Sequence, residues 1–411
     1  MNVNKLETII ADQKTSFQKR SPGVKREIEF NKHLKTKQIT VISGIRRAGK
    51  STLLRQFSEH YSDFYYINFD DERLIDFNLE DFNDLMLAFQ KQTQADVILL
   101  DEIQNVDNWE RFVRRIFEEG YKIFLTGSNA NLLNSELAAK LTGRYFKIEL
   151  FPFSFKEFLN MRNVDPEAKD TAGRAKLLKL CREYLQDGGF PEFLDYGDPE
   201  FVTRTYEDIL YRDIIAKYSI REIKAFKELV FYLFSNFTNE TSYNSLKNTL
   251  GFKSVTSVKN YIEYLKESYL IFPIYKYDYS LKKQYTSDKK IYVIDNGMRN
   301  RISFSFSEDE GRSMENVVFL ELARRGEEIY FFKGNKECDF LIKRKNKITD
   351  CIQVSRNLDE NNREREITGL AEAMETFNLG KGIIISEEEE GIKNVNGKKI
   401  EFIPLYKWLL S

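Results

Sequence analysis

The chain contains very little histidine and cysteine for its length. Its 411 residues include two histidines, His33 and His60, and three cysteines, Cys181, Cys338 and Cys351. So few histidines argue against a histidine-based metal centre and against a Ser-His-Asp triad. An odd number of widely spaced cysteines fits neither a disulfide framework nor a zinc ribbon. This cysteine usage is typical of a protein that works in a reducing cytoplasm.

Long apolar runs and a strong net charge are also missing. No stretch approaches the roughly 18 uncharged apolar residues that a membrane span requires, and residues 1–20 lack the apolar segment of a signal peptide. We therefore expect a cytoplasmic protein with no membrane partner. Lys and Arg number 63 and Asp and Glu number 64, which gives a net charge of -1. That balance argues against extensive coating of nucleic acid but permits a local basic surface.

The chain has ample material for a core and a clear alternation of elements. Hydrophobic residues make up 42% and aromatic residues 14%, so no metal or disulfide is needed for stability. Its length predicts two to four domains at roughly 100–200 residues each. After two expected helices within residues 3–34, short apolar strands alternate with helices, which predicts an α/β fold with a buried parallel sheet and helices on both faces. The strands are expected at 39–42, 64–69, 97–100, 122–125 and 145–150.

A glycine-rich run after the first expected strand matches G-x-x-x-x-G-K-[ST] in full. It reads Gly44, Ile45, Arg46, Arg47, Ala48, Gly49, Lys50, Ser51 and Thr52. Two glycines let the backbone curl so that its N–H groups face phosphate oxygens, and the following helix adds its positive end. We expect Lys50 to neutralise the β and γ phosphates of ATP and the Ser51 hydroxyl to ligate Mg²⁺.

Polar residues follow the next strands. Asp101 ends the strand 97–100, where a parallel sheet presents its ligands, and is predicted to hold Mg²⁺, while Glu102 would polarise the attacking water. After the strand 122–125, Ser128 or Asn129 could sense the γ-phosphate, although turn chemistry explains Gly-Ser-Asn equally well. Arg144 could reach a phosphate in its own or a neighbouring subunit, or could make an ordinary surface salt bridge.

The rest of the chain is expected to contain three further segments. Residues 154–236 look almost wholly helical, with an interruption at Gly188-Gly189-Phe190-Pro191. Residues 242–300 read as helix, turn, helix and strand pair, the layout of a winged helix, and the last segment alternates helices with strands. The domain boundaries that we predict are 1–152 for the phosphate-loop core, 153–238 for a helical lid, 239–305 for the winged helix and 306–411 for a small α/β domain.

The segment 242–300 is basic, with ten Lys or Arg against five acids. Its second helix begins with Ser254, Thr256, Ser257, Lys259 and Asn260, which would suit contacts with DNA phosphates. Val258, Ile262 and Leu265 on the same helix are spaced for one buried face. Winged helices also pack between domains without touching DNA, so both interpretations stay open at this point.

The order of elements in the last segment is similar to that of restriction-endonuclease folds. Glu315 would lie on a helix and Asp339 on a strand, as metal-binding carboxylates do in such folds. The third position departs from the pattern, because Gln353 replaces the second strand carboxylate and Ser355 replaces a lysine. Lys343 could substitute in space. A degenerate binding domain is therefore favoured over an active nuclease.

Taken together, these segments resemble the AAA-type ATPases of bacteria and archaea that carry a C-terminal domain of unknown function. The resemblance implies ATP binding, Asp101 and Glu102 as the Walker B pair, a sensor at Ser128 or Asn129 and possible use of Arg144 as an arginine finger. It also implies a winged helix and a nuclease-like C-terminal fold. It implies no particular substrate.

The function that the sequence favours is an ATP-dependent, Mg²⁺-dependent switch or motor that acts on DNA or a DNA-associated complex, as a homo-oligomer or with a protein partner. One alternative is a DNA nuclease gated by ATP that uses Glu315 and Asp339. Another is a nucleotide-gated scaffold for protein interaction or signalling, in which the basic wing contacts a protein.

Overall fold

The computed structural model describes residues 1–128, 143–167, 170–303, 310–360 and 362–411. The chain divides into two compact units, Met1–Phe151 and Pro152–Ser411. The predicted α/β class is confirmed, because the first unit is a parallel sheet with helices and the second contains a mixed sheet. The finer division into four domains stays a prediction.

The first unit is built on a five-stranded sheet in the order β2-β3-β4-β1-β5, with every neighbouring pair parallel. Its strands are β1 (Ile39–Gly44), β2 (Tyr65–Asn68), β3 (Val97–Asp101), β4 (Lys122–Gly127) and β5 (Tyr145–Leu150). Its α-helices are α1 (Val3–Lys19), α2 (Phe30–Lys35), α3 (Lys50–Ser58), α4 (Phe82–Gln92) and α5 (Trp109–Glu118), with short 3₁₀ turns at Glu72–Leu74, Leu79–Asp81 and Ile103–Asn105. All five expected strands are present.

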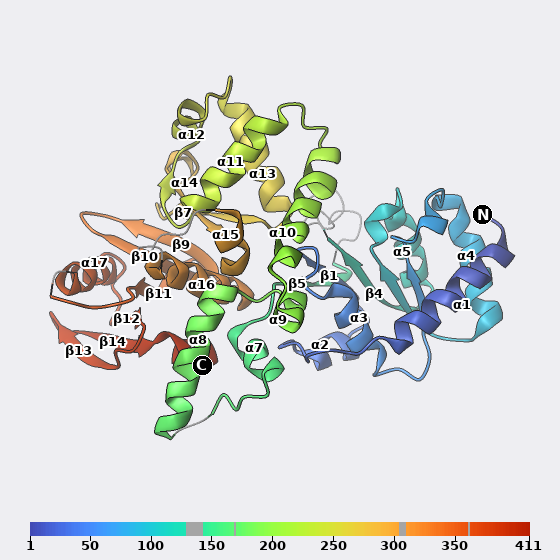
Figure 1. Cartoon of the computed structure of the whole chain (residues 1–411), viewed down its shortest axis with the longest axis horizontal. Coiled ribbons are helices and arrows are strands. Elements are labelled where there is room, and N and C mark those ends of the chain that lie inside the picture. The colour runs from blue at the N-terminus through green and yellow to red at the C-terminus, as the bar shows by residue number, and fades with distance from the viewer. Residues whose placement is uncertain (129–142, 168–169, 304–309, 361) are drawn as a thin grey trace. The chain divides into compact units, whose positions relative to one another are not determined.

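Both faces of this sheet are covered, which is why its central strands read as unbroken apolar runs. Ile98 and Leu100 of β3 point into a core that they share with α1, α4 and α5. On the other face α3 packs on the sheet, with the ring of Phe57 4.6 Å from the ring of Phe124 on β4 (Figure 1). Because these strands are parallel, the carboxyl ends of β1, β3 and β4 lie at one edge of the sheet.

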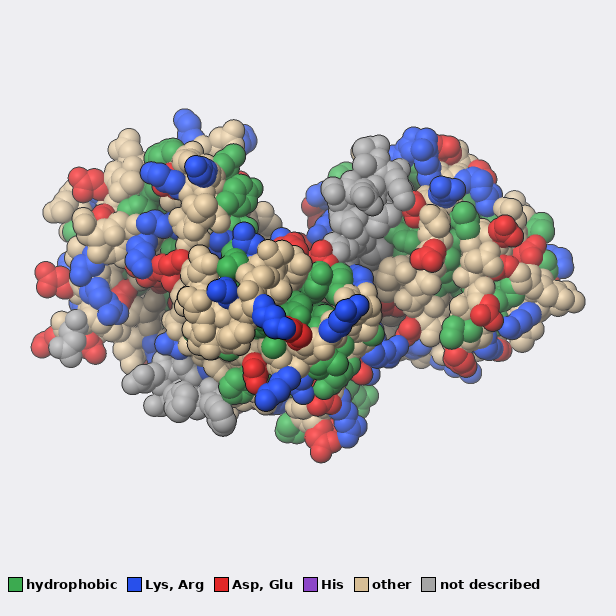
Figure 2. Space-filling view, turned by 90° about the horizontal axis from the view of Figure 1, so that it is seen from above, with side chains coloured by type: hydrophobic (Ala, Val, Ile, Leu, Met, Phe, Trp, Pro, Cys, Tyr) green, Lys and Arg blue, Asp and Glu red, His purple; other side chains and the backbone are tan. Residues whose placement is uncertain are grey.

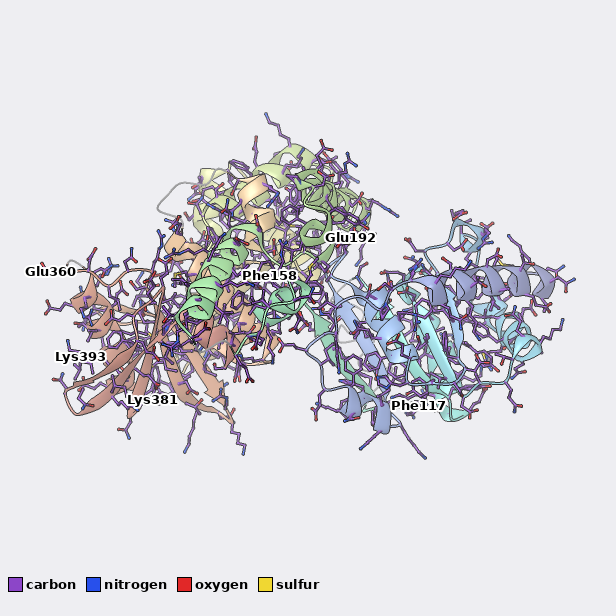
Figure 3. All side chains as sticks on the ribbon, turned by 60° about the horizontal axis from the view of Figure 1, so that its bottom comes forward. Phe117, Phe158, Glu192, Glu360, Lys381 and Lys393 are labelled. Carbon is purple, nitrogen blue, oxygen red and sulfur yellow. The ribbon has the colours of Figure 1, made fainter. Side chains whose placement is uncertain are left out.

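The second unit begins with a helical region. Its helices are α7 (Phe155–Met161), α8 (Thr171–Asp187), α9 (Pro191–Tyr196), α10 (Pro199–Asp208), a π-helix (Ile209–Ala216), α11 (Ile223–Ser235), α12 (Tyr243–Thr249), α13 (Val255–Glu267), α14 (Leu281–Thr286), α15 (Asn296–Ile302), α16 (Glu310–Arg324), α17 (Arg363–Thr376) and α18 (Leu405–Leu410). Phe158 on α7 lies beside α8, where its ring is 5.6 Å from that of Tyr184 (Figure 3).

The strands of the second unit form one nine-stranded sheet in the order β13-β14-β12-β11-β10-β9-β7-β8-β6. They are β6 (Glu240–Thr241), β7 (Ile271–Lys276), β8 (Lys289–Val293), β9 (Glu328–Lys333), β10 (Glu337–Arg344), β11 (Lys347–Val354), β12 (Lys381–Ser386), β13 (Gly391–Val395) and β14 (Lys398–Pro404). The hairpin β7-β8 of the expected wing pairs with β9 through Tyr275 and Lys276 (Figure 1). The winged segment and the last segment therefore share a sheet, which the sequence pattern does not reveal.

The glycine pair at 188–189 is explained by close backbone approach. A side chain on Gly189 would place its Cβ 2.3 Å from the carbonyl oxygen of Phe153, and one on Gly188 would meet the carboxylate of Asp295 at 2.2 Å. The N–H of Gly189 donates to Asp295 at 2.6 Å. Burial raises the pKa of Asp295 to about 6, although the backbone N–H groups of Gly189 and Met298 oppose that shift. The interruption in the helical region thus fastens α8 to the start of α15.

Among the described residues, no helix is both long and apolar enough to cross a membrane.

Candidate functional site

The phosphate loop connects β1 to α3 at the carboxyl edge of the first sheet. Gly49 has φ 94° and stands directly before α3, a conformation that glycine adopts without steric cost. Gly44 lies against β5, and a Cβ there would fall 2.1 Å from the carbonyl oxygen of Leu150. Both motif glycines are therefore required by local geometry, and the helix that follows begins at Lys50, which leaves its N-terminal N–H groups at the loop.

Lys50 points into the loop. Its ammonium donates to the carbonyl oxygens of Gly44 at 3.2 Å and Ile45 at 3.3 Å, and it lies 3.7 Å from a carboxylate oxygen of Glu102. The side chain is buried. This buried ammonium contacts two uncharged carbonyl oxygens and lies near one carboxylate. An anionic ligand at the loop can therefore attract it away from the carbonyl oxygens.

Asp101, at the tip of β3, is fully buried and held at both oxygens. The hydroxyl of Thr126 donates to Oδ1 at 2.5 Å, and the hydroxyl of Tyr66 donates to Oδ2 at 3.2 Å. Ser51 at the start of α3 also hydrogen-bonds this carboxylate. Burial raises the pKa of Asp101, and the adjacent Glu102 raises it further. The carboxylate is thus fixed in place, next to the hydroxyl that the loop supplies.

Glu102 follows in a left-handed conformation with φ 51°, which turns its side chain out of the line of β3. Its carboxylate accepts from the side-chain amide of Gln104 at 2.5 Å, and Ser128 also bonds it. Burial works against the charged form, but Lys50 and the hydrogen bond from Gln104 together lower the pKa of Glu102. A non-glycine residue held at positive φ next to a phosphate loop indicates a position set by function.

This arrangement fits Mg²⁺. Asp101 brings a buried carboxylate and Ser51 a hydroxyl to one point, and such hard oxygens are the protein ligands that Mg²⁺ uses together with substrate phosphates. The carboxylate of Asp101 accepts from three hydroxyl groups, those of Thr126, Tyr66 and Ser51, which are uncharged. A cation at this point would remove the electrostatic cost of burying that carboxylate.

Sequence reasoning did not assign roles to three residues that hold this site, Tyr66, Gln104 and Thr126. Thr126 and Gln104 lie close to residues that the sequence does indicate. Thr126 is near Ser128 at the end of β4, and Gln104 follows the acidic pair, so their positions could have suggested a role in the site. Tyr66 lies inside an aromatic strand and looked like core. Its ring does stack on Phe17 with centroids 3.9 Å apart, and only the hydroxyl is directed at Asp101.

Arg26, before β1, is another contributor that the sequence did not indicate. It is buried, and its guanidinium donates to the carbonyl oxygens of Ala48 in the loop and Phe151 at the end of the first unit, both at 2.7 Å. One side chain therefore joins the phosphate loop to the residue at which the chain leaves this unit.

Arg144 is not brought to the loop of its own subunit. It precedes β5, its carbonyl accepts from Ile39 at the start of β1, and the parallel register puts Gly44 beside Leu150 at the far end. At ~3.3 Å per residue the two ends are roughly 17 Å apart. Its guanidinium lies 3.4 Å from Glu118 and 6.0 Å from the ring of Phe117, which is labelled in Figure 3. The guanidinium of Arg144 is therefore remote from the phosphate loop of its own chain in this structure, and its role as an arginine finger stays a prediction.

The remaining predicted sensor, Asn129, lies outside the described residues. Ser128 is described and contacts Glu102, so the structure brings one of the two sensor candidates to the site.

In the second unit, Glu315 and Asp339 do come together. Both carboxylates contact the ammonium of Lys290, at 2.9 and 3.0 Å respectively. Gln353 lies beside them, with its side-chain oxygen accepting from the backbone N–H of Asp339 at 3.2 Å. Lys343 does not approach this cluster, because it pairs with Glu328 at 2.9 Å. The lysine nearest the acids comes from the winged segment.

The winged segment is less basic at its surface than its composition suggests. Three of its ten bases and one of its five acids are buried, namely Lys289, Lys290, Arg299 and Asp295. Seven bases and four acids remain accessible, so the surface excess is +3 instead of +5. On the face shown in Figure 2, Lys and Arg side chains alternate with Asp and Glu over both units.

Comparison with known proteins gives three consecutive family matches. A family model described as "AAA domain" matches residues 36–159, a domain of unknown function (DUF8612) matches 178–309, and another (DUF4143) matches 310–408. Among solved structures, the Orc1 protein of Aeropyrum pernix in complex with DNA is 12% identical, with a TM-score of 0.33 over 66% of this chain and 88% of that one. The replication initiator DnaA bound to AMPPCP and single-stranded DNA is 16% identical, with a TM-score of 0.28 over 64% of this chain and 91% of that one.

Two relatives match nearly end to end. The "Uncharacterized protein MJ1544" of Methanocaldococcus jannaschii is 40% identical over 98% of this chain and 95% of its own length. An "Uncharacterized protein" of Haemophilus influenzae is 30% identical over 91% of this chain and 94% of its own length. The chain therefore belongs to the family of these two proteins, and it is an AAA-domain protein whose later segments are the domains of unknown function DUF8612 and DUF4143.

Proposed function

We propose that the chain is a switch that binds and hydrolyses ATP in the presence of Mg²⁺. The observation that carries this proposal is the meeting of the phosphate loop and the acidic strand tip at one sheet edge. Lys50 lies 3.7 Å from Glu102, and Ser51 hydrogen-bonds Asp101. These four side chains are the set that triphosphate hydrolysis requires, namely a phosphate cation, two metal-binding oxygens and a base.

The role of each side chain follows from its contacts. Lys50 exchanges the carbonyl oxygens of Gly44 and Ile45 for the β and γ phosphates of ATP. Ser51 and Asp101 would hold Mg²⁺, which when bound offsets the charge that develops on the phosphates. Glu102 is kept ionised by Lys50, and an ionised carboxylate at this place accepts the proton of the attacking water.

Two substitutions test the proposal with different readouts. Lys50→Ala should abolish ATP binding, measured by fluorescence anisotropy of a labelled ATP analogue, because the loop then lacks its cation. Glu102→Gln should leave that binding within about twofold of wild type and slow hydrolysis by roughly 10²-fold or more, since an amide cannot accept the proton. Normal affinity in Lys50→Ala would refute the loop assignment, and unchanged hydrolysis in Glu102→Gln would remove the base.

A matched control is present in the loop itself. Arg47 is exposed, whereas Lys50 is buried among the loop carbonyls. Arg47→Ala removes one positive charge from the same loop without removing the buried ammonium, so ATP binding should survive. Equal losses in Arg47→Ala and Lys50→Ala would indicate a general electrostatic effect instead of a specific contact.

We further propose that helix α13 contacts DNA. Val258, Ile262 and Leu265 are buried and fix the helix to the core, while Lys259 and Asn260 are exposed on its opposite side. Ser254 caps the helix by accepting from the N–H of Ser257 at 3.0 Å. An anchored helix with an exposed polar and basic side is the element that winged helices present to DNA.

Binding of labelled duplex, forked and single-stranded DNA at low salt, together with DNA stimulation of ATP hydrolysis, tests this second proposal. Lys259→Glu should weaken binding to every DNA, because a phosphate contact is lost regardless of sequence. Lys179→Glu is the control, since Lys179 is an exposed lysine on α8 and α8 is not proposed to touch DNA. If no DNA binds at low salt, a nucleotide-gated protein scaffold becomes the better interpretation.

A further inference from the structure

The ammonium of Lys290 lies between Glu315 and Asp339, the two carboxylates that the sequence suggested as metal ligands. Lys290 lies on β8, and its side chain is 4% exposed. Its nitrogen is 2.9 Å from Glu315, 3.0 Å from Asp339 and 2.5 Å from Glu337. An ammonium has three hydrogens, so each can be directed at a different carboxylate.

Each of the two acids accepts one further hydrogen bond. The hydroxyl of Tyr292 donates at 2.6 Å to Oε1 of Glu315, the same oxygen that Lys290 contacts, and the backbone N–H of Val354 donates at 3.0 Å to the second oxygen of Asp339. The distances from the acids to Lys290 are those of charge-assisted hydrogen bonds. The cluster is therefore arranged around an ammonium group.

Gln353 contributes nothing to a cation at this place. Its amide oxygen accepts from the backbone N–H of Asp339, and its amide nitrogen donates to Glu366 at 2.6 Å. In an active nuclease of this layout the corresponding carboxylate would face the metal. Here the side chain is neutral and both of its ends are occupied, so the residues present do not fit a catalytic metal site.

The electrostatics agree with the geometry. Burial disfavours the ammonium, but the carboxylates of Glu315 and Asp339 raise the pKa of Lys290 well above its ordinary value. Burial raises the pKa of Glu315 to about 7, an effect that Lys290 opposes and Asp339 increases. Lys290 therefore supplies the directly bonded positive charge that balances the two acids, whereas Arg365, which also interacts with Asp339, is paired with Glu366.

We propose that Lys290 is the resident cation of the Glu315–Asp339 cluster, so that an internal lysine replaces the metal and the last domain does not cleave nucleic acid. The same side chain fastens the strand β8 of the winged segment to α16 and β10 of the last segment. The nuclease-like cluster of Glu315 and Asp339 thus serves, with Lys290, to hold two segments of one sheet together. This inference is independent of the proposed ATPase activity.

The test compares thermal unfolding of the full chain by calorimetry with and without Mn²⁺, at pH 8 and pH 6. Lys290→Met keeps the length of the side chain and removes its charge. We expect it to lower the melting temperature at pH 8 by about 10 °C, to lower it less at pH 6, where Glu315 with its raised pKa binds a proton, and to become stabilised by Mn²⁺. Any change that Mn²⁺ causes in the melting temperature of the wild type should be the same in Asp339→Asn. Lys343→Met, at a partly buried lysine that is paired with Glu328 away from the cluster, should behave as wild type.

A double variant covers the case in which Lys290→Met does not fold. Lys290→Met with Glu315→Gln removes one charge of each sign and should regain much of the lost stability. A Lys290→Met protein as stable as wild type at pH 8, or no recovery in the double variant, would overturn the proposal. So would cleavage of plasmid DNA by the wild type with Mg²⁺ or Mn²⁺ that is lost in Asp339→Ala.

Discussion

The hydroxyl of Thr126, at the end of β4, donates a 2.5 Å hydrogen bond to Oδ1 of Asp101 at the end of β3, and the same hydroxyl oxygen accepts from the backbone N–H of Glu102 at 2.9 Å. One side chain thus fixes both the residue assigned to the metal and the backbone of the residue assigned to the base. Because β3 and β4 are adjacent and parallel, this bond also ties together the two strand ends that border the phosphate loop.

Thr126→Val should therefore lower the turnover of ATP more than its binding. Valine keeps the shape of threonine but can neither donate to Asp101 nor accept from Glu102, which leaves a buried carboxylate with one hydrogen bond fewer. We expect kcat to fall by about 10- to 100-fold, with ATP affinity within about threefold of wild type. Steady-state hydrolysis and nucleotide binding measure the two quantities separately.

Thr126→Ser is the matched variant, because serine keeps the hydroxyl and loses only a methyl group. It should retain most of the activity. If Thr126→Ser is as impaired as Thr126→Val, packing of the methyl group and not the hydrogen bond is what matters.

Arg26→Met should weaken ATP binding. Arg26 satisfies the buried carbonyl oxygens of Ala48 and Phe151, so its loss leaves the loop backbone without a fixed partner and raises the cost of ordering it around a phosphate. We expect roughly a tenfold weaker affinity, measured with a labelled ATP analogue. Lys25→Met is the control at an exposed neighbour. Equal affinity in Arg26→Met and wild type would show that the loop needs no such anchor.

Local signals in the sequence were sufficient for the first unit. Gly44–Ser51 and Asp101 could be placed because a glycine-bent loop and a strand-ending acid are fixed by their immediate neighbours, and a parallel sheet brings the strand ends together. Thr126 and Asp101 are 25 residues apart in sequence, and only the strand order decides that they touch. That pairing could not be predicted from spacing alone.

The burial of Lys290, in contrast, could not be predicted from the local sequence. In a segment rich in lysine it looked like a surface charge available to DNA, but it is buried against Asp339, which lies 49 residues later in the sequence. Nothing in the local pattern separates it from Lys282 or Lys283, which are exposed. The difference arises from the pairing of β7 with β9, a long-range contact that joins the two segments.

Gly189→Ala should destabilise the second unit by about 1–3 kcal/mol. The new Cβ would fall 2.3 Å from the carbonyl oxygen of Phe153, a backbone atom that cannot move independently. Gly380→Ala is the control, since a Cβ there meets no atom within 4 Å. The chain has two tryptophans, Trp109 and Trp408, one in each unit. In a Trp109→Phe background the fluorescence of Trp408 reports on the second unit alone. A Gly189→Ala protein as stable as Gly380→Ala would mean that the backbone can shift without cost.

His33 should make the first unit less stable in acid. Burial, followed by the charges of Lys32 and Lys122, lowers the pKa of His33 to about 4 from its ordinary 6.5, although Glu29 opposes the shift. The unfolded chain therefore binds a proton that the folded chain rejects between these two values, so the free energy of unfolding falls as the pH drops from about 6.5 to 4. After allowance for solvent screening we expect a loss on the order of 1–2 kcal/mol.

His33→Phe should remove this part of the pH dependence, because a phenyl ring can take the place of the imidazole between Phe57 and Phe146 without binding a proton. Urea unfolding at pH 7 and pH 4.5 measures the effect, with the fluorescence of Trp109 in a Trp408→Phe background as the signal from the first unit. His60→Gln changes the exposed histidine and should keep the wild-type dependence. If His33→Phe loses as much free energy of unfolding between pH 7 and pH 4.5 as the wild type, the loss comes from the carboxylates and protonation of His33 contributes nothing.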